Sequence, residues 1–275
     1  MKRERFIIKE ENNLIKAVQN RLPFLSNYQI EKILNRRDIK VNGIRVKADT
    51  NLAIGDKIEL FHNYEEKPWF EIVYQDENVI VINKKCGIEV ISETDRDVLS
   101  ILKNEIGETY PIHRIDRNTE GLVIFAKNQM AEKELLEAFK TRKLSKRYLL
   151  EVVGKIDAET IKERLFLKKL SNVSKVLISE VKTSGFDEIK TKFKHIKFID
   201  NNTILEAELI TGKTHQIRAH ISYYGHSIVG DGKYGKGDGK LHLTAYFIKF
   251  NLPQTSKLAY LNNIHFEIMP TWINI

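Results

Sequence analysis

The apolar segments of this 275-residue chain are short, and their order constrains the fold more than any other feature of the sequence. VIVIN (79–83) is typical of a buried strand. The apolar, β-favouring content of GLVIFAK (121–127) predicts a second strand, and YLLEVVG (148–154) a third. TKFKHIKFI (191–199) and NTILEAELI (202–210) partly alternate apolar and polar residues. This alternation favours an antiparallel or mixed sheet.

Two helices are predicted among these strands. VLSILKNEI (98–106) has helical periodicity, and Ala131, Leu135, Ala138 and Arg142 follow one stripe of a longer helix. Strands and helices do not alternate regularly enough for a doubly wound parallel sheet. The sequence therefore predicts an α+β fold, with a mixed, largely antiparallel central sheet and flanking helices.

Residues 13–62 are expected to form a compact unit of their own. Apolar residues at helical spacing predict two helices, with Ser26 as the cap of the second. IKVNGIRVK (39–47) is typical of a β-hairpin, because an Asn42-Gly43 pair favours a type I′ turn. The second helix and the hairpin carry basic side chains that could form one phosphate-binding face: Lys32, Arg36, Arg37, Lys40, Arg45 and Lys47.

The balance of charge favours a polyanionic partner without demanding one. The chain has 45 Lys and Arg residues against 37 Asp and Glu residues, a net charge of +8. Basic residues cluster at 32–47 and at 140–147. Either cluster alone is more simply explained as a solvated charged surface.

Several other classes of protein are disfavoured. No stretch approaches the roughly 20 apolar residues of a membrane span, and residues 1–13 lack the apolar core of a signal peptide, so a cytoplasmic protein is expected. Cys86 is the only cysteine, and no zinc-ligand spacing occurs, so neither a disulfide framework nor a metal site is predicted. GDGKYG (230–235) matches a dinucleotide-binding pattern, but it lacks the flanking strand and helix, and a flexible surface loop is the simpler interpretation.

One candidate functional residue is an aspartate placed just before an apolar run. In HRIDRNTEGLVIFAK (113–127), Asp116 lies between Arg114 and Arg117. Neighbouring guanidinium groups attract the carboxylate by charge and hydrogen bonding, so Asp116 is expected to be a permanent anion.

A second candidate lies in THQIRAHISYYG (214–225), which predicts a helix starting at Thr214. Arg218 would project from its first turns, where it could pair with a carboxylate from elsewhere. His215 and His220 are five residues apart rather than four, so they are expected to bind backbone or RNA instead of a metal. Taken singly, each of these residues is more simply explained by a structural ion pair or by the core.

Taken together, the segments resemble the successive motifs of the pseudouridine synthases of the RluA, RluC and RluD type. The similarity covers nearly all of residues 70–275. Residues 13–62 resemble the S-four type of RNA-binding module, named after a small-subunit ribosomal protein, which several members of the family carry. The matching segments are YQDENVIVINKKCG (74–87), HRIDRNTEGLVIFAK (113–127), SKRY (145–148), TGKTHQIRAHISYYGHSIVGD (211–231) and LHLTAYFIKF (241–250).

The resemblance implies a small N-terminal α/β RNA-binding domain at residues 1–65 and a catalytic domain with a basic cleft at residues 66–275. It implies an isomerase that detaches uracil from its ribose within RNA and rejoins it through carbon instead of nitrogen. Such a reaction needs no redox change, nucleotide energy or metal, so no cofactor is expected. Residues 84–87 read Lys-Lys-Cys-Gly where the family commonly has Lys-Pro-x-Gly, which removes a proline-stiffened turn.

The resemblance also implies roles for three residues. Asp116 matches the family's essential aspartate, which would either attack an electron-poor centre or stabilise an oxocarbenium-like sugar. Tyr148 matches a tyrosine that can stack on uracil and that lies where a group could remove the proton from the new glycosidic carbon. Arg218 matches the arginine that pairs with the aspartate and keeps it ionised.

Chemistry on a base within folded RNA requires that base to leave its stack, and Arg114 matches the residue that fills the vacancy. By analogy with members that carry the N-terminal module, large-subunit ribosomal RNA is preferred to transfer RNA as the target, and a monomer is expected. A non-catalytic RNA-binding or ribosome-assembly protein and a hydrolase remain as alternatives. Further RNA contacts are expected from His113, Arg117, Lys146, Arg147, His215, Gln216 and the basic residues of the first domain.

Overall fold

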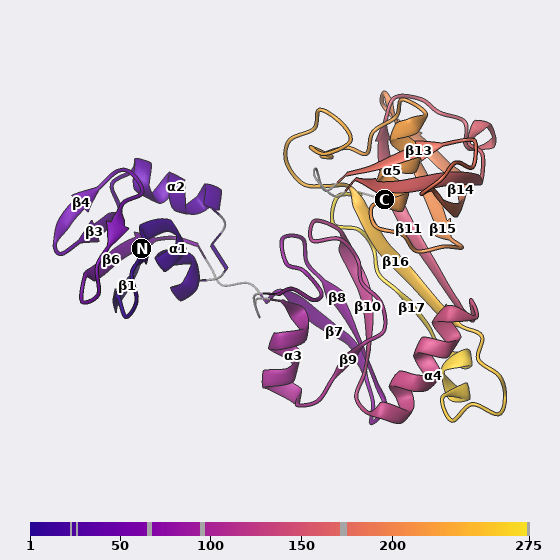
Figure 1. The fold of residues 1–275 in the computed structure, drawn as a ribbon, viewed down its shortest axis with the longest axis horizontal. Helices are drawn as coiled ribbons and strands as arrows, with labels where there is room; N and C mark the ends of the chain where they lie inside the picture. The colour runs from indigo at the N-terminus through magenta and orange to yellow at the C-terminus, as the bar shows by residue number, and fades with distance from the viewer. Residues whose placement is uncertain (23, 26, 65–67, 94–96, 171–174, 274–275) are drawn as a thin grey trace. The chain divides into compact units, whose positions relative to one another are not determined.

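The computed structural model describes residues 1–275 apart from 23, 26, 65–67, 94–96, 171–174 and 274–275 (Figure 1). The chain divides into two compact units, Met1–Pro68 and Trp69–Ile275, and each is described by itself. The expected helix cap at Ser26 and the expected domain boundary between residues 65 and 66 lie outside the described residues. In the described part, no helix is long and apolar enough to cross a membrane.

The first unit packs helices against a small antiparallel sheet. Its described elements are β1 (Lys2–Ile7), β2 (Asn12–Asn13), α1 (Leu14–Arg21), α2 (Asn27–Asn35), β3 (Ile39–Val41), β4 (Ile44–Val46), β5 (Asn51–Leu52) and β6 (Lys57–His62). The sheet order is β1-β6-β3-β4, and apolar side chains from both helices and the sheet form one core. Asn42 (φ 51°) and Gly43 (φ 84°) form the turn between β3 and β4, so the predicted Asn-Gly hairpin is confirmed.

One large sheet forms the second unit, and eleven strands belong to it as far as the chain is described. They are β7 (Phe70–Gln75), β8 (Val79–Lys84), β9 (Tyr110–Pro111), β10 (Glu120–Ala126), β11 (Leu144–Val153), β12 (Arg164–Leu170), β13 (Lys175–Ser179), β14 (Asp187–Ile199), β15 (Asn202–Leu209), β16 (Leu243–Phe250) and β17 (His265–Glu267). The order is β13-β12-β14-β15-β11-β16-β10-β8-β7, with β17 paired to β16 and β9 to β10. Of the described strand pairs, only β10 and β16 run parallel, so the predicted α+β fold with a largely antiparallel sheet is confirmed.

Helices cover both faces of the middle of this sheet. The described helices are α3 (Val98–Ile106), α4 (Gln129–Lys140) and α5 (Gln216–Tyr223), with short 3₁₀ turns η1 (Ala158–Thr160) and η2 (Ala259–Asn263). α3 and α5 pack in one apolar cluster with Val123 and Phe125 of β10, and α4 packs in another with Leu122 and Ile124. Alternate strand residues point to opposite faces, so both faces of β10 are buried. This explains why β10 is apolar without interruption after Glu120.

The starts of the helices follow two different rules. Asp97 and Asn128 cap α3 and α4, because each side chain accepts a hydrogen bond from a backbone N–H in the first turn. α5 has no such side-chain cap, and His215 precedes it with a left-handed φ of 55°. The predicted start at Thr214 is therefore wrong: the backbone turns at His215 first, and α5 begins at Gln216.

The parallel pairing of β10 with β16 depends on Gly121. Its φ of 125° lies in a region that residues with side chains rarely adopt. A Cβ atom at this position would lie 2.4 Å from the carbonyl oxygen of Ala245 and 2.6 Å from its nitrogen. Only glycine lets the two strands approach this closely, just after the segment that carries Asp116.

Replacing Gly121 with alanine should destabilise the second unit by about 2–4 kcal/mol, because backbone strain adds to the overlap with Ala245. Gly107→Ala is the matched control, since Gly107 also has a positive φ (98°) but an added Cβ would meet nothing within 4 Å. The control should cost about 1 kcal/mol. Urea unfolding measures both changes, and equal losses would contradict a role for the close approach to Ala245.

Candidate active site

Three segments far apart in the sequence meet at one cavity of the second unit. The cavity has a volume of about 240 Å³, and its lining includes Asp116 from the loop before β10, Tyr148 from β11 and Arg218 from α5. Five of the expected RNA contacts also line it: His113, Arg114, Lys146, His215 and Gln216. The fold therefore brings together the three residues to which the resemblance assigns catalytic roles.

Asp116 is half-buried, with 23% of its side chain exposed. Its Oδ2 atom lies 3.1 Å from Nη1 of Arg218 and 3.8 Å from Nε2 of His215, so the expected ion pair with Arg218 is present. Arg117, which flanks Asp116 in sequence, instead donates from Nε to the carbonyl oxygen of Gly87 at 3.0 Å. The positive charge beside the carboxylate thus comes from α5, about a hundred residues further along the chain.

Arg218 is held by a second carboxylate, that of Asp231. Its Nε and Nη2 atoms each donate to one Asp231 oxygen at 2.8 Å, in the two-pronged geometry that guanidinium and carboxylate groups favour. Asp231 also accepts from the backbone N–H groups of Lys233 and Tyr234. Burial acts to raise the pKa of Asp231, but the hydrogen bonds from Arg218 outweigh it, and the pKa lies below its ordinary value.

Sequence reasoning missed Asp231. The interpretation of residues 230–235 as a flexible surface loop is wrong at this residue, which is only 1% exposed. Its hydrogen bonds to Arg218 hold the segment against α5. The sequence did contain a signal for this pairing. Arg218 and Asp231 both lie in residues 211–231, and a buried guanidinium group needs an acidic partner.

Tyr148 lies beside an irregularity in the pairing of β11 with β16. Arg147 pairs with Phe247 and Tyr148 with Ala245, so the extra residue, Tyr246, belongs to β16. Tyr148 is buried, and this burial, together with the charge of Asp116, raises the pKa of its hydroxyl. It is therefore a neutral phenol at physiological pH.

His215 faces the carboxylate of Asp116 without reaching it. The Tyr234 hydroxyl oxygen accepts a hydrogen bond from Val176 N at 3.0 Å, so its proton can be donated to Nδ1 of His215, 2.9 Å away. In the neutral imidazole the proton then lies on Nε2, the atom that faces Asp116. Burial lowers the pKa of His215, which favours this neutral form.

Three of the expected RNA contacts are buried in the protein: His113, Lys146 and Gln216. The side-chain amide of Gln216 uses both its oxygen and its nitrogen in hydrogen bonds to nearby protein groups, and the residue is only 2% exposed. These bonds hold the start of α5, and the RNA contact of Gln216 stays a prediction. His113 is also buried, and its Nε2 atom accepts from the backbone N–H of Ile124.

The segment that departs from the family pattern is fixed by a buried lysine to which sequence reasoning gave no role. The ammonium group of Lys84 donates to the carbonyl oxygens of Lys85, Ile88 and Arg117 at 2.8–3.1 Å. The backbone N–H of Gly87 also donates to Arg117. Burial lowers the pKa of Lys84 to about 8. These bonds tie the turn to the loop before β10 without a proline.

Arg147, in the second unit, is not among the residues that line this cavity. The guanidinium group of Arg147 lies 4.8 Å from the ring centre of Phe247 and 3.7 Å from Glu206. In the first unit, Arg45 donates to the carbonyl oxygen of Arg37, which joins the end of α2 to the hairpin. The basic side chains of that region are exposed or partly exposed: Lys32, Arg36, Arg37, Lys40 and Arg45, with Lys40 paired to Glu59.

The cavity thus offers one partly exposed carboxylate beside a fixed guanidinium group, a neutral imidazole and a neutral phenol. Such a site can present an anion to an electron-poor carbon or to a developing positive charge. Within the described residues, no group of three or more His, Cys, Asp or Glu side chains is placed to hold a metal ion.

Comparisons with known proteins agree with this geometry. The family model for RNA pseudouridylate synthase matches residues 78–223. A Rickettsia felis protein named ribosomal large subunit pseudouridine synthase C is 32% identical over 93% of this chain and 92% of its own length. A protein of the same name from Vibrio vulnificus is 28% identical over 89% of this chain and 86% of its own length.

Two solved structures share the fold. Human RNA pseudouridylate synthase domain containing 1 is 21% identical, with a TM-score of 0.57 over 75% of this chain and 86% of that chain. Human RNA pseudouridylate synthase domain containing 4 is also 21% identical, with a TM-score of 0.54 over 70% of this chain and 90% of that chain. With the family match and the relative at 32% identity, these findings show that the chain belongs to the RNA pseudouridylate synthase family, in its RluA/RluC-type branch.

Proposed function

We propose that this protein converts specific uridines of large-subunit ribosomal RNA to pseudouridine, with Asp116 as the catalytic carboxylate. The observation that carries the proposal is the 3.1 Å contact between Asp116 and Arg218 at the cavity. The contact leaves the carboxylate partly exposed, and it is directed by a guanidinium group that is itself fixed by Asp231. The position of the carboxylate is thereby defined before substrate arrives.

The reaction is a net isomerisation of the nucleotide. The bond between ribose C1′ and uracil N1 breaks, a bond between C1′ and C5 forms, and a proton moves from C5 to solvent while N1 gains one. Asp116 can help to break the bond between C1′ and N1 in two ways: by attacking an electron-poor centre, or by stabilising a positively charged sugar. Both routes use the carboxylate anion. Tyr148, a buried neutral phenol at the same cavity, is proposed to pack against uracil and to take part in proton removal from C5.

The target base has to leave its stack to reach this site. A cavity of about 240 Å³ has room for a small ring but not for a duplex. Arg114 is exposed at the edge of the cavity, and its planar guanidinium group is proposed to fill the vacancy among the remaining bases.

Large-subunit ribosomal RNA is proposed as the target because of the names of the relatives. Proteins named ribosomal large subunit pseudouridine synthase C match across most of both chains, first unit included. The exposed basic residues of α2 and the hairpin are proposed to bind RNA phosphates in the manner of an S-four module. A role in ribosomal RNA modification supports the further proposal that the protein is cytoplasmic.

Asp116→Asn should remove pseudouridine formation, with a loss of at least about 10³-fold in single-turnover rate, because the amide cannot supply the anion. RNA affinity should change less than about threefold, since the fold and its basic surfaces are retained. Asp200→Asn is the matched control, because Asp200 is exposed and its positive φ of 51° suits asparagine equally well.

The assay uses unmodified ribosomal and transfer RNA and maps pseudouridine by carbodiimide-dependent primer extension. Wild-type product that is lost in Asp116→Asn and retained in the control supports the proposal. Binding without product would favour the non-catalytic assembly protein, and free uracil with abasic sites would indicate a hydrolase. Product in transfer RNA alone would overturn the assignment of the target.

The proposed phosphate contacts of the first unit can be tested separately, through the salt dependence of RNA affinity. Arg36→Gln should weaken RNA binding and lower the slope of log affinity against log salt by about 1, because one phosphate contact is lost. The single-turnover rate at saturating RNA should be unchanged. Lys9→Gln, which removes one exposed charge from the same unit, is the control, and equal salt slopes for the two variants would count against a specific binding face.

A further inference from the structure

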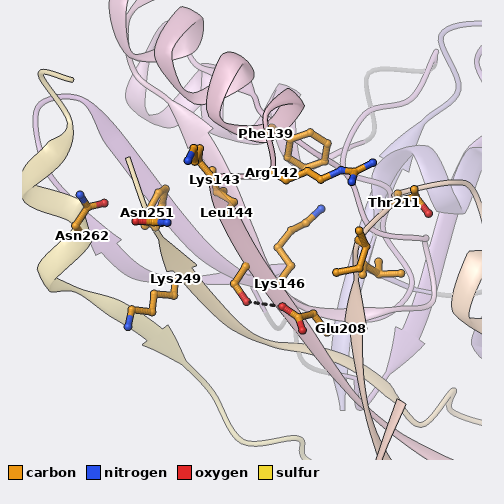
Figure 2. A pocket seen from close by; sticks show the side chains of 15 residues that line it. Phe139, Arg142, Lys143, Leu144, Lys146, Glu208, Thr211, Lys249, Asn251 and Asn262 are labelled. Carbon is orange, nitrogen blue, oxygen red and sulfur yellow. Dashed lines mark hydrogen bonds between the residues drawn. The ribbon is translucent and has the colours of Figure 1, made fainter. Parts of the chain in front are cut away.

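A second and larger cavity adjoins the one that holds Asp116. Its volume is about 520 Å³, within the range of about 300–1,000 Å³ typical of small-molecule sites. It is formed by the end of α4 and by β11, β15 and β16 (Figure 2). The two cavities share part of their lining: Phe139, Lys146, Leu209 and Gly212. A chain that leaves the first cavity past these residues enters the second directly.

The second cavity is strongly cationic. Its lining contains Arg142, Lys143, Lys146 and Lys249 but one carboxylate, that of Glu208. Within the part of the chain that the structure describes, none of the four cations forms an ion pair with an acid. The surplus of positive charge is available to an anionic ligand.

Lys146 differs from the other three cations because it is buried. Only 9% of it is exposed, and its ammonium group lies 4.0 Å from the centre of the Phe139 ring. In Figure 2 the side chain points toward Phe139 and away from Glu208. Burial without an acidic partner lowers the pKa of Lys146 to about 8. An unpaired buried charge destabilises a folded protein, so its position calls for a partner that arrives with the ligand.

We propose that the second cavity binds the nucleotide next to the target uridine, and that Lys146 binds the phosphate that links the two. This inference rests on the proposed function, because the first cavity is taken to hold the uridine. Lys146 lines both cavities. It therefore lies where the RNA backbone that joins the two bound nucleotides has to pass. Arg142, Lys143 and Lys249 are exposed at the second cavity and can bind the next phosphate.

Glu208 orients the bound nucleotide. Its Oε1 atom accepts from the Ser145 hydroxyl at 3.2 Å, the contact drawn in Figure 2. A carboxylate repels phosphate and accepts hydrogen bonds from neutral donors, such as a ribose hydroxyl or a base amino group. The phosphate therefore belongs at the Lys146 side of the cavity and the sugar and base at the Glu208 side.

Lys146→Met separates this role from a structural one. It keeps a long apolar side chain on Phe139 but removes the unpaired charge, so the melting temperature of the free protein should stay the same or rise. Binding of an RNA oligonucleotide that contains the mapped target uridine should weaken about tenfold or more, the scale of a charge-assisted contact. Lys146→Arg should retain most of the affinity. Lys103→Met, which removes an exposed charge on α3, is the matched control.

The decisive measurement replaces one of the two linkages flanking the target uridine by an uncharged methylphosphonate. At one linkage, neutralisation should weaken binding to the wild type about tenfold and to Lys146→Met hardly at all, because both changes remove the same contact. Two results would overturn this inference even if the wild-type protein forms pseudouridine. In the first, the loss of affinity from Lys146→Met adds to the loss from neutralising either linkage. In the second, Lys146→Met binds the RNA as tightly as the wild type. Absence of pseudouridine with the wild-type protein would instead overturn both proposals.

Discussion

The guanidinium group of Arg218 is the point on which the site depends. It is buried, and a buried cation is stable only when acidic partners surround it in suitable geometry. Asp231 takes two of its nitrogen atoms and leaves Nη1 for Asp116. The direction of the proposed catalytic carboxylate, that of Asp116, is therefore set by the interior of the protein. A loop of exposed residues could not hold it as firmly, because water would compete for the same contacts.

Much of this architecture could be predicted from local patterns. The uninterrupted apolar run of β10 indicates a strand covered on both faces, and the Asn42-Gly43 pair indicates its hairpin, because each depends on neighbouring residues alone. The ion pair of Asp116 with Arg218 was predictable only through the family motifs. The true start of α5 and the burial of Gln216 were not, since both depend on contacts made across the fold.

Polar groups buried around the site fall into two kinds, and the distinction separates structure from ligand binding. Lys84 and Asp231 have their charges met by backbone carbonyls or by Arg218, so the free protein already contains their partners. Lys146 has an aromatic ring beside it but no acidic partner within the described chain. The amino-acid composition does not distinguish these two kinds of charged residue. Only the partners distinguish a charge that holds the fold together from one that awaits another molecule.

The position of β16 has a consequence for biosynthesis. β7, β8 and β10 come early in the chain, β11 to β15 come later, and β16 alone joins these two groups of strands. Until residues 243–250 have left the ribosome, each group presents one unpaired strand edge, which is a template for wrong association. The loop that carries Asp116 and the strand that carries Tyr148 also remain on separate pieces of sheet. The candidate active site is therefore complete only after the last major strand inserts.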